Sequence, residues 1–268
     1  MGVRTQAWKM VFVAMLAASG RAMHAEDPKQ IVQQAVNAEL AANRADDAHW
    51  RYVETEMGGN KYIVVETEHG ALKRHIEEGG KPLPAEANNE DLAAIQRFIH
   101  DPSLQAKQKR DGAHDEKDAE ELLNLLPQAF VWKIESETPT TISLAFQPDP
   151  NFHPPDMEAR VMGEMAGTLV VDKSLHRIKT MKGALTQEID IGFGILGKLR
   201  KGGTFDIERR EVAPGLWEVT ESRVHIDGRA LFFKTIGQQQ DELKFEFTRV
   251  PPGTTLEQAV GMLDAPAK

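Results

Sequence analysis

The sequence of 268 residues predicts an α+β fold in which an antiparallel sheet packs against a few helices. Three observations carry this prediction. Runs of alternating apolar and polar residues recur along the chain, turn residues separate these runs, and a few segments show the apolar spacing of a helix instead. The chain is 41% hydrophobic and 27% charged, which is an ordinary globular composition. Because no long linker interrupts the pattern, we expect one domain over residues 26–268.

Residues 1–25 have the pattern of a secretory signal peptide. Basic residues and no acid precede an apolar run at residues 10–18. This run is too short for a membrane-spanning helix, which needs about 20 residues, so we expect it to be removed. Cleavage after Ala25 is favoured, and cleavage after Ala22 is the alternative.

The charge and the absence of cysteine narrow the class of protein. Removal of residues 1–25 takes away three basic residues and no acid, so the net charge changes from −9 to −12. An acidic surface disfavours nucleic acid and anionic membranes as partners, and we expect no stable membrane insertion after cleavage. Without cysteine there can be no disulfide, zinc–thiolate site, iron–sulfur cluster, thiol nucleophile or acylated lipoprotein cysteine. We therefore expect a periplasmic protein, with full secretion as the alternative.

The mature N-terminus predicts a helix followed by a meander of strands. Asp27 can cap the helix, Pro28 suits its first position, and an apolar stripe continues until the helix ends near residues 43–47. Three β-rich runs then follow, separated by glycine and asparagine turns, and they occupy residues 50–53, 62–67 and 71–77.

Residues 84–127 read as a helical insertion packed over the sheet. An apolar helical stripe surrounds Ile95, and a second one, rich in leucine, stops at Pro127. Residues 101–121 between them contain eleven charged residues, which predicts a solvated helix or loop.

Strand patterns return after residue 127 and persist to the C-terminal region. Apolar residues alternate in these runs: Phe130/Trp132, Ile142/Leu144/Phe146, Leu169/Val171, Phe205/Ile207, Trp217/Val219, Leu231/Phe233 and Leu243/Phe245/Phe247. Turns are predicted between them at Asp149-Pro150-Asn151, Asp172-Lys173-Ser174, Gly202-Gly203, Ala213-Pro214-Gly215 and Asp227-Gly228. A last helix is expected at residues 254–264, with Thr254 and Glu257 spaced as a capping box.

Motifs for catalysis or cofactors are weak in this chain. Residues 192–197 match G-x-G-x-x-G, but Gly202-Gly203 would end any following helix, so a glycine-rich turn is the better interpretation and no cofactor is expected. Nine histidines are scattered without metal-binding spacing, so no metal site is predicted. Serine hydrolase motifs are missing. A pair of carboxylates could be assembled from distant strands, which keeps a hydrolase as a third hypothesis.

Large and adaptable side chains in the strands have two interpretations. They fill an ordinary core, or they line an apolar cavity that a curved sheet leaves open, and methionine suits varied ligands. The residues are Trp50, Tyr52, Phe130, Trp132, Phe146, Trp217, Phe232 and Phe233, with Met162, Met165 and Met181.

Two segments resemble known families. Residues 165–172 have the G-x-L-x-x-D pattern of the Lol-type periplasmic lipoprotein carriers, and the order of helix, strands, helical insertion and strands is similar to theirs. Residues 192–236 resemble an uncharacterised family of exported bacterial proteins. The first resemblance implies a strongly curved antiparallel sheet, an incomplete β-barrel wrapped around helices, with an apolar cavity for acyl chains.

These observations predict a non-enzymatic periplasmic binding protein that carries the acyl chains of a lipoprotein, a lipid or another apolar ligand. The alternative is an envelope module that binds a partner protein or senses a signal without bound lipid. The candidate cavity residues are Trp50, Tyr52, Phe130, Trp132, Leu144 and Phe146.

Overall fold

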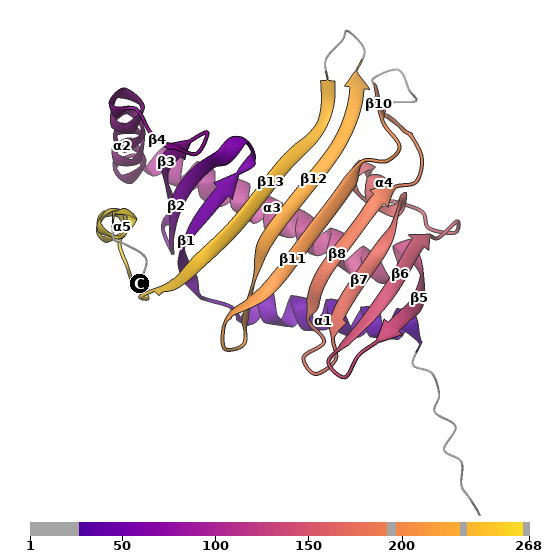
Figure 1. The fold of residues 1–268 in the computed structure, drawn as a ribbon. Coiled ribbons are helices and arrows are strands. Elements are labelled where there is room, and N and C mark those ends of the chain that lie inside the picture. The colour runs from indigo at the N-terminus through magenta and orange to yellow at the C-terminus, as the bar shows by residue number, and fades with distance from the viewer. Residues whose placement is uncertain (1–26, 192–196, 231–234, 265–268) are drawn as a thin grey trace, which may run out of the picture.

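The computed structural model describes residues 27–191, 197–230 and 235–264, and within them thirteen strands form one antiparallel sheet (Figure 1). The predicted signal peptide, residues 192–196 of the glycine-rich motif, and the predicted strand residues Leu231, Phe232 and Phe233 lie outside the described residues. The coarse prediction of an α+β fold with a large antiparallel sheet is confirmed, and the sheet is not closed into a barrel.

The strands follow the chain mostly as a meander. They are β1 (His49–Glu56), β2 (Asn60–Thr67), β3 (Gly70–Glu78), β4 (Lys81–Pro82), β5 (Phe130–Glu137), β6 (Thr141–Pro148), β7 (Met165–Asp172), β8 (Ile178–Leu185), β9 (Ile189–Ile191), β10 (Gly197–Leu199), β11 (Thr204–Ala213), β12 (Leu216–Ala230) and β13 (Thr235–Val250).

The order of the strands in the sheet places the first strand of the chain beside the last. It runs β4-β3-β2-β1-β13-β12-β11-β8-β7-β6-β5, and β10 pairs with β12 and β9 beside this path. The last strand, β13, therefore lies between the first strand, β1, and β12. This long-range pairing makes one continuous sheet from two meanders.

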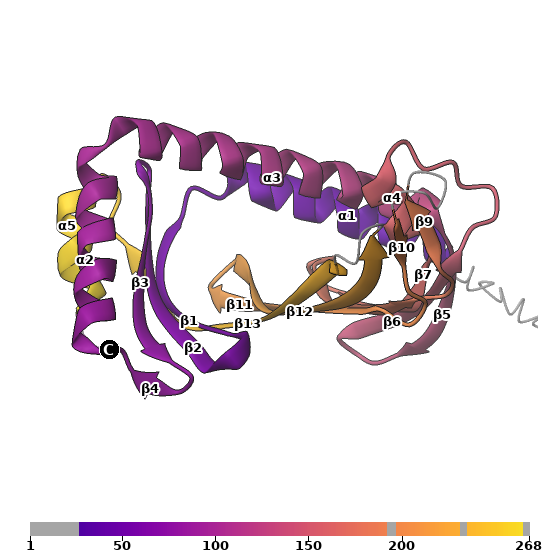
Figure 2. The same ribbon diagram turned by 90° about the horizontal axis from the view of Figure 1, so that it is seen from above.

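Helices lie on both faces of this sheet. They are α1 (Pro28–Ala45), the short 3₁₀ helix η1 (Met57–Gly59), α2 (Ala85–His100), α3 (Pro102–Ala129), α4 (Met157–Gly163) and α5 (Leu256–Leu263). Figure 2 shows α1 and α3 side by side above the sheet, while α2 and α5 flank its β3 end. None of the described helices is long and apolar enough to cross a membrane.

The start of α1 is as the sequence predicts. The side chain of Asp27 accepts a hydrogen bond from the Lys29 backbone N–H at 3.0 Å, and Pro28 occupies the first turn. The apolar stripe of the helix is buried against the sheet, and it consists of Ile31, Val32, Ala35, Val36 and Leu40. This packing fixes α1 over β5 and β8.

Two core clusters hold the two ends of the sheet. Under α1 and the end of α3, the larger cluster includes Phe130, Phe146 and Leu169. At the other end, α2 and α5 pack on β2 and β3 through residues such as Ile95 and Leu256.

Three local predictions were wrong: the end of the second leucine stripe, the turn at Asp227-Gly228, and the position of the last capping box. The second leucine stripe does not stop at Pro127, because α3 continues to Ala129 and this proline falls in its last turn. Asp227 and Gly228 form no turn, since both pair with β13 inside the long strand β12 and the ladder outweighs their turn preference.

The capping box of α5 is displaced by one residue from its predicted position. The Thr255 hydroxyl accepts from the Gln258 backbone N–H at 3.3 Å, and the Gln258 side chain accepts from the Thr255 N–H at 2.9 Å. Thr254 instead donates its hydroxyl to the carbonyl of Pro251 at 2.6 Å, which closes the preceding turn. The expected helical insertion is confirmed as α2 and α3, and the charged segment belongs to helix rather than loop apart from Asp101, which caps α3. The short helix α4 was not predicted.

Candidate functional site

A groove of about 930 Å³ opens between the sheet and the three helices α1, α3 and α4. We call it the apolar groove. It is lined by Glu39, Asn43, Asp46, Ala119, Leu122, Leu123, Leu126, Met157, Glu158, Val161, Met162, Met165, Ile178, Met181, Leu199, Phe205, Ile207, Arg209, Trp217, Glu218, Val219 and Ile226.

The floor of the groove comes from the alternation of the strands. Phe205 and Ile207 lie on the same face of β11, because successive side chains of a strand point to opposite faces. Met165 and Met181 of the paired strands β7 and β8 extend this floor. The roof is the leucine stripe of α3, and α4 closes one end with its own residue Met162.

The other end of the groove is polar, and its polar residues come from the end of α1 and from two strands of the sheet. Glu39 and Asn43 are four residues apart, which places them on one side of α1, and Asp46 is the C-cap residue directly after the helix. Arg209 and Glu218 face this end from β11 and β12. Along β11 the lining therefore changes from Phe205 and Ile207 at the apolar end to Arg209 at the polar end.

A buried ion network anchors the polar end. Glu39 is 1% exposed, and its carboxylate accepts from Arg177 through Nε at 3.0 Å and Nη2 at 2.9 Å. The backbone N–H of Ile178 donates to the same carboxylate at 2.7 Å, and Arg209 contacts it through Nη1. Arg209 also donates to the Trp217 carbonyl at 3.2 Å. One carboxylate on α1 thus ties two arginines of the sheet together.

Two further carboxyl groups stand near this end. Burial raises the pKa of Glu218, and the charges of Glu66 and Asp46 add to the shift. Burial also raises the pKa of Glu66, although the Trp50 backbone N–H donates to its carboxylate at 3.0 Å and favours the ionised form.

A second cluster of acidic residues lies on β1 and β13, outside the groove lining. Burial raises the pKa of Glu54 to about 7, Lys73 opposes this rise, and Glu242 adds to it. Lys73 contacts Glu54 and lies 2.5 Å from Glu56. Sequence patterns could not select this pair of carboxylates, because Glu54 and Glu242 are 188 positions apart and meet only through the pairing of β1 with β13.

The six residues predicted to line a cavity lie outside the groove. Three of them form an aromatic cluster in the main core, where Phe130 lies 5.6 Å from Trp132 and 4.6 Å from Phe146 between ring centroids, and Leu144 is fully buried beside them. This is the core interpretation, since α1 covers these positions. Contact of these four residues with a ligand stays a prediction, and none of them lines the apolar groove.

Trp50 and Tyr52 pack elsewhere, against Phe247 on β13. Their ring centroids lie 6.0 Å and 5.3 Å from that of Phe247. In contrast, the three methionines singled out as adaptable side chains all line the groove, and they are Met162, Met165 and Met181. The leucine stripe of α3 was a visible signal for the roof, whereas nothing in the local pattern marked α4.

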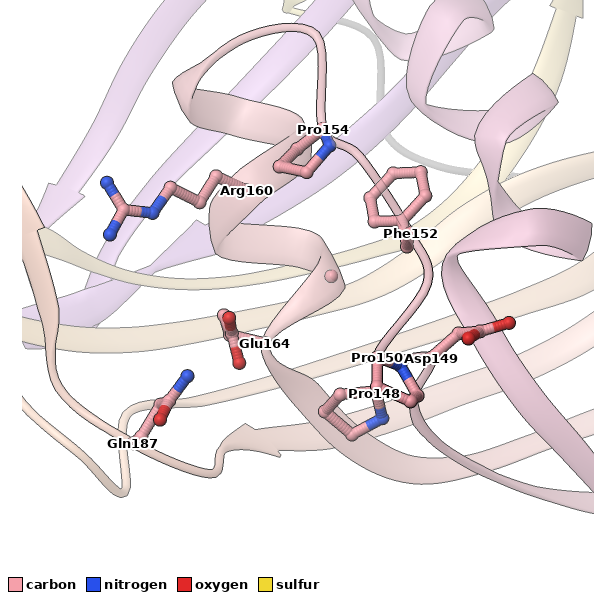
Figure 3. Close-up of a pocket in the computed structure, with 9 residues that line it drawn as sticks. Pro148, Asp149, Pro150, Phe152, Pro154, Arg160, Glu164 and Gln187 are labelled. Carbon is pink, nitrogen blue, oxygen red and sulfur yellow. The ribbon is translucent and has the colours of Figure 1, made fainter.

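A smaller pocket of about 310 Å³ lies against α4. Figure 3 shows Glu164 and Gln187 on one side of it and the loop with Phe152 and its flanking prolines on the other. Its mixed polar lining and one third of the volume make it a poorer candidate for an apolar ligand than the groove.

Among the described residues, no group of three or more His, Cys, Asp or Glu side chains is arranged to hold a metal ion. The fold and the groove define an α+β protein with an open antiparallel sheet and one large apolar groove. Comparison with protein-family models, with curated proteins and with solved structures gives no match.

Proposed function

We propose that this protein is a non-enzymatic binding protein that holds an acyl chain or another apolar ligand in the apolar groove. The single observation that carries the proposal is the groove itself. Its volume of about 930 Å³ falls within the range of about 300–1,000 Å³ typical of ligand pockets, and its lining is mostly aliphatic, aromatic and methionine side chains. The acyl chains of a lipoprotein or lipid are the ligands with the matching chemistry.

The energetics of burial suit this proposal. Each methylene group removed from water contributes about 0.8 kcal/mol, so about ten methylene groups contribute about 8 kcal/mol before the cost of association. Methionine side chains at Met162, Met165 and Met181 could adapt to chains of different shape, since the thioether is flexible and polarisable.

The sequence of residues 1–25 supports export as part of the proposal, with the periplasm as the favoured compartment and full secretion as the alternative. An acyl chain that crosses an aqueous compartment must be shielded from water, and a groove between a sheet and helices provides such shielding.

The proposal is tested first by native mass spectrometry of the mature protein from a bacterial periplasm, with organic extraction of bound material. We expect an acyl species at near-stoichiometric amount, or uptake of an added fluorescent acyl probe. A clean apo mass combined with no uptake of acyl probes would contradict the proposal.

A pair of variants localises the binding. Ile207→Trp fills the floor of the groove and should weaken probe binding by about tenfold or more, since the tail and the indole compete for one space. Leu243→Trp is the matched control, because Leu243 on β13 is 45% exposed and lies outside the groove lining. Equal binding by the two variants would place the ligand elsewhere.

A partner-binding or sensory module is the second candidate function, and α3 provides the observation that favours it. Residues 106–117 of this helix are all exposed, and they carry ion pairs along the helix such as Lys107–Asp111 at 2.5 Å. The Gln108 side chain joins this stretch to β3 through hydrogen bonds with the Ala71 backbone at 2.8 Å and 3.0 Å. The exposed charged residues beside it can offer a face to an envelope protein. Failure to take up any acyl probe would favour this candidate.

A further inference from the structure

The polar end of the groove contains more carboxylates than the local arginines can neutralise. Glu39, Asp46 and Glu218 line this end, and Glu66 lies close enough to raise the pKa of Glu218. Two guanidinium groups face these four acids, those of Arg177 and Arg209. Lys244 and His49 also lie near Glu66, and Lys244 is paired with Glu242 at 3.4 Å.

Both arginines are already committed to holding α1 on the sheet. Arg177 uses Nε and Nη2 for Glu39, and Arg209 uses Nη1 for Glu39 and Nη2 for the carbonyl of Trp217. The remaining Nε of Arg209 is buried without a hydrogen-bond partner, so solvent and ligands do not reach it. An anionic head group at this end would therefore find its potential partners occupied and the nearby carboxylates repulsive.

Two other features make the potential at this end negative. Helix α1 ends at Ala45, and the carbonyls of a last helical turn carry a partial negative charge, which the exposed Arg44 of the same turn opposes in part. Asp46, the residue that follows, is exposed at the rim, and Glu218 is half-buried beside the groove. A carboxylate removed from water, as Glu218 is, gains more from a nearby cation than one in bulk solvent does.

We infer that the apolar groove takes an amphiphile with a cationic head group, an amine or a quaternary ammonium, whose head lies between Asp46 and Glu218. The tail then runs along Phe205 and Ile207 toward α4, in the direction in which the lining becomes apolar. This inference rests on the proposed function and names the class of ligand that the same groove selects.

The test compares three probes with the same twelve-carbon chain, each below its critical micelle concentration and at pH 8. They are dodecyltrimethylammonium, laurate and the neutral dodecyl maltoside, and calorimetry gives their dissociation constants with the mature protein. We expect the cation to bind at least about tenfold more tightly than laurate, which corresponds to about 1.4 kcal/mol. Equal or tighter binding of laurate would overturn the inference while the proposed function stands. If none of the three probes binds, the proposed function itself fails.

Two single variants test where the preference for a cationic head group arises, and each removes one negative charge from the groove lining. Glu218→Gln should reduce the ratio of laurate to cation dissociation constants to near one, because the half-buried carboxylate at the head position is lost. Glu158→Gln is the matched control, since Glu158 is exposed on α4 at the opposite end of the groove. It should leave the ratio unchanged. An unchanged ratio in Glu218→Gln, or an equal loss in both variants, would overturn the assignment of the head group to this end.

Discussion

Arg177 and Glu39 form a two-point ion pair in the protein interior, with Nε–Oε1 and Nη2–Oε2 distances of 3.0 Å and 2.9 Å. Glu39 belongs to the buried face of α1, and Arg177 immediately precedes β8. Since Arg209 and the Ile178 N–H share the same carboxylate, one side chain of the helix satisfies donors from two places in the sheet. This contact sets the distance between α1 and the floor at the polar end of the groove.

Loss of the Glu39 carboxylate should destabilise the fold strongly. Glu39→Ala leaves two largely buried guanidinium groups without their shared acceptor, and breaking a buried ion pair in this way typically costs about 3–5 kcal/mol. Urea denaturation followed by circular dichroism measures the free energy of unfolding. Gln34→Ala on the exposed face of the same helix is the control and should change it by less than about 0.5 kcal/mol. A stability of Glu39→Ala within that margin of the parent protein would show that the network contributes little.

Gly167 and Gly183 mark a close approach of β7 and β8 beside the groove. They face each other in the pairing of β7 with β8, and a Cβ on Gly167 would lie 1.9 Å from the Lys182 carbonyl oxygen and 2.6 Å from the Gly183 Cα. Both obstacles are backbone atoms, which cannot move aside without distorting the ladder.

We therefore expect Gly167→Ala to lower the free energy of unfolding by about 1–3 kcal/mol. Gly112→Ala is the matched control, because Gly112 is exposed in the middle of α3 and a Cβ there meets no atom within 4 Å. That substitution should raise stability by up to about 1 kcal/mol, since alanine favours the helix. The two substitutions should thus have opposite signs in thermal or urea unfolding, and the same sign in both would refute the steric account.

Much of this fold could be predicted from local sequence patterns, because each pattern reflects a physical requirement of the helix or strand that it predicts. The cap at Asp27, the alternation of the strands and the leucine stripe of α3 each reflect a periodicity that the chain must satisfy to bury one face. The placement of β13 between β1 and β12 has no such local signal, because it depends on which of many possible strand pairs gains most from burial. The same holds for Glu39 and Arg177, which are 138 positions apart.

The candidate site was harder to predict than the fold, for one reason. Phe146 and Phe205 have the same alternating context in the sequence, and both face the helices. Phe146 is 1% exposed in the core under α1, whereas Phe205 is half-buried and lines the groove. What separates them is the length and course of the covering helices, so the pattern finds inward faces but does not distinguish a filled interior from a hollow.

The carboxyl group of Glu54 should make stability depend on pH. Its pKa rises from an ordinary value near 4.5 to about 7 in the folded protein, chiefly through burial. Between these values the folded state binds more protons than the unfolded state, so the free energy of unfolding falls as the pH increases from about 4.5 to 7. The stabilising contribution of the protonated group is complete below 4.5 and is lost above 7.

Glu54→Gln keeps the size of the side chain and removes the titration. Relative to the parent protein, this variant should have nearly equal stability at pH 4 and should be more stable at pH 8, by on the order of 2 kcal/mol. Urea denaturation at half-unit pH intervals measures the difference. Glu56→Gln is the control on the same lysine: Lys73 and other hydrogen-bond donors outweigh burial and hold the pKa of Glu56 below its ordinary value. In Glu56→Gln, the free energy of unfolding should therefore still fall between pH 4.5 and 7. A Glu54→Gln variant whose stability parallels the parent protein across this range would show that Glu54 stays ionised in the fold, with Lys73 as its dominant neighbour.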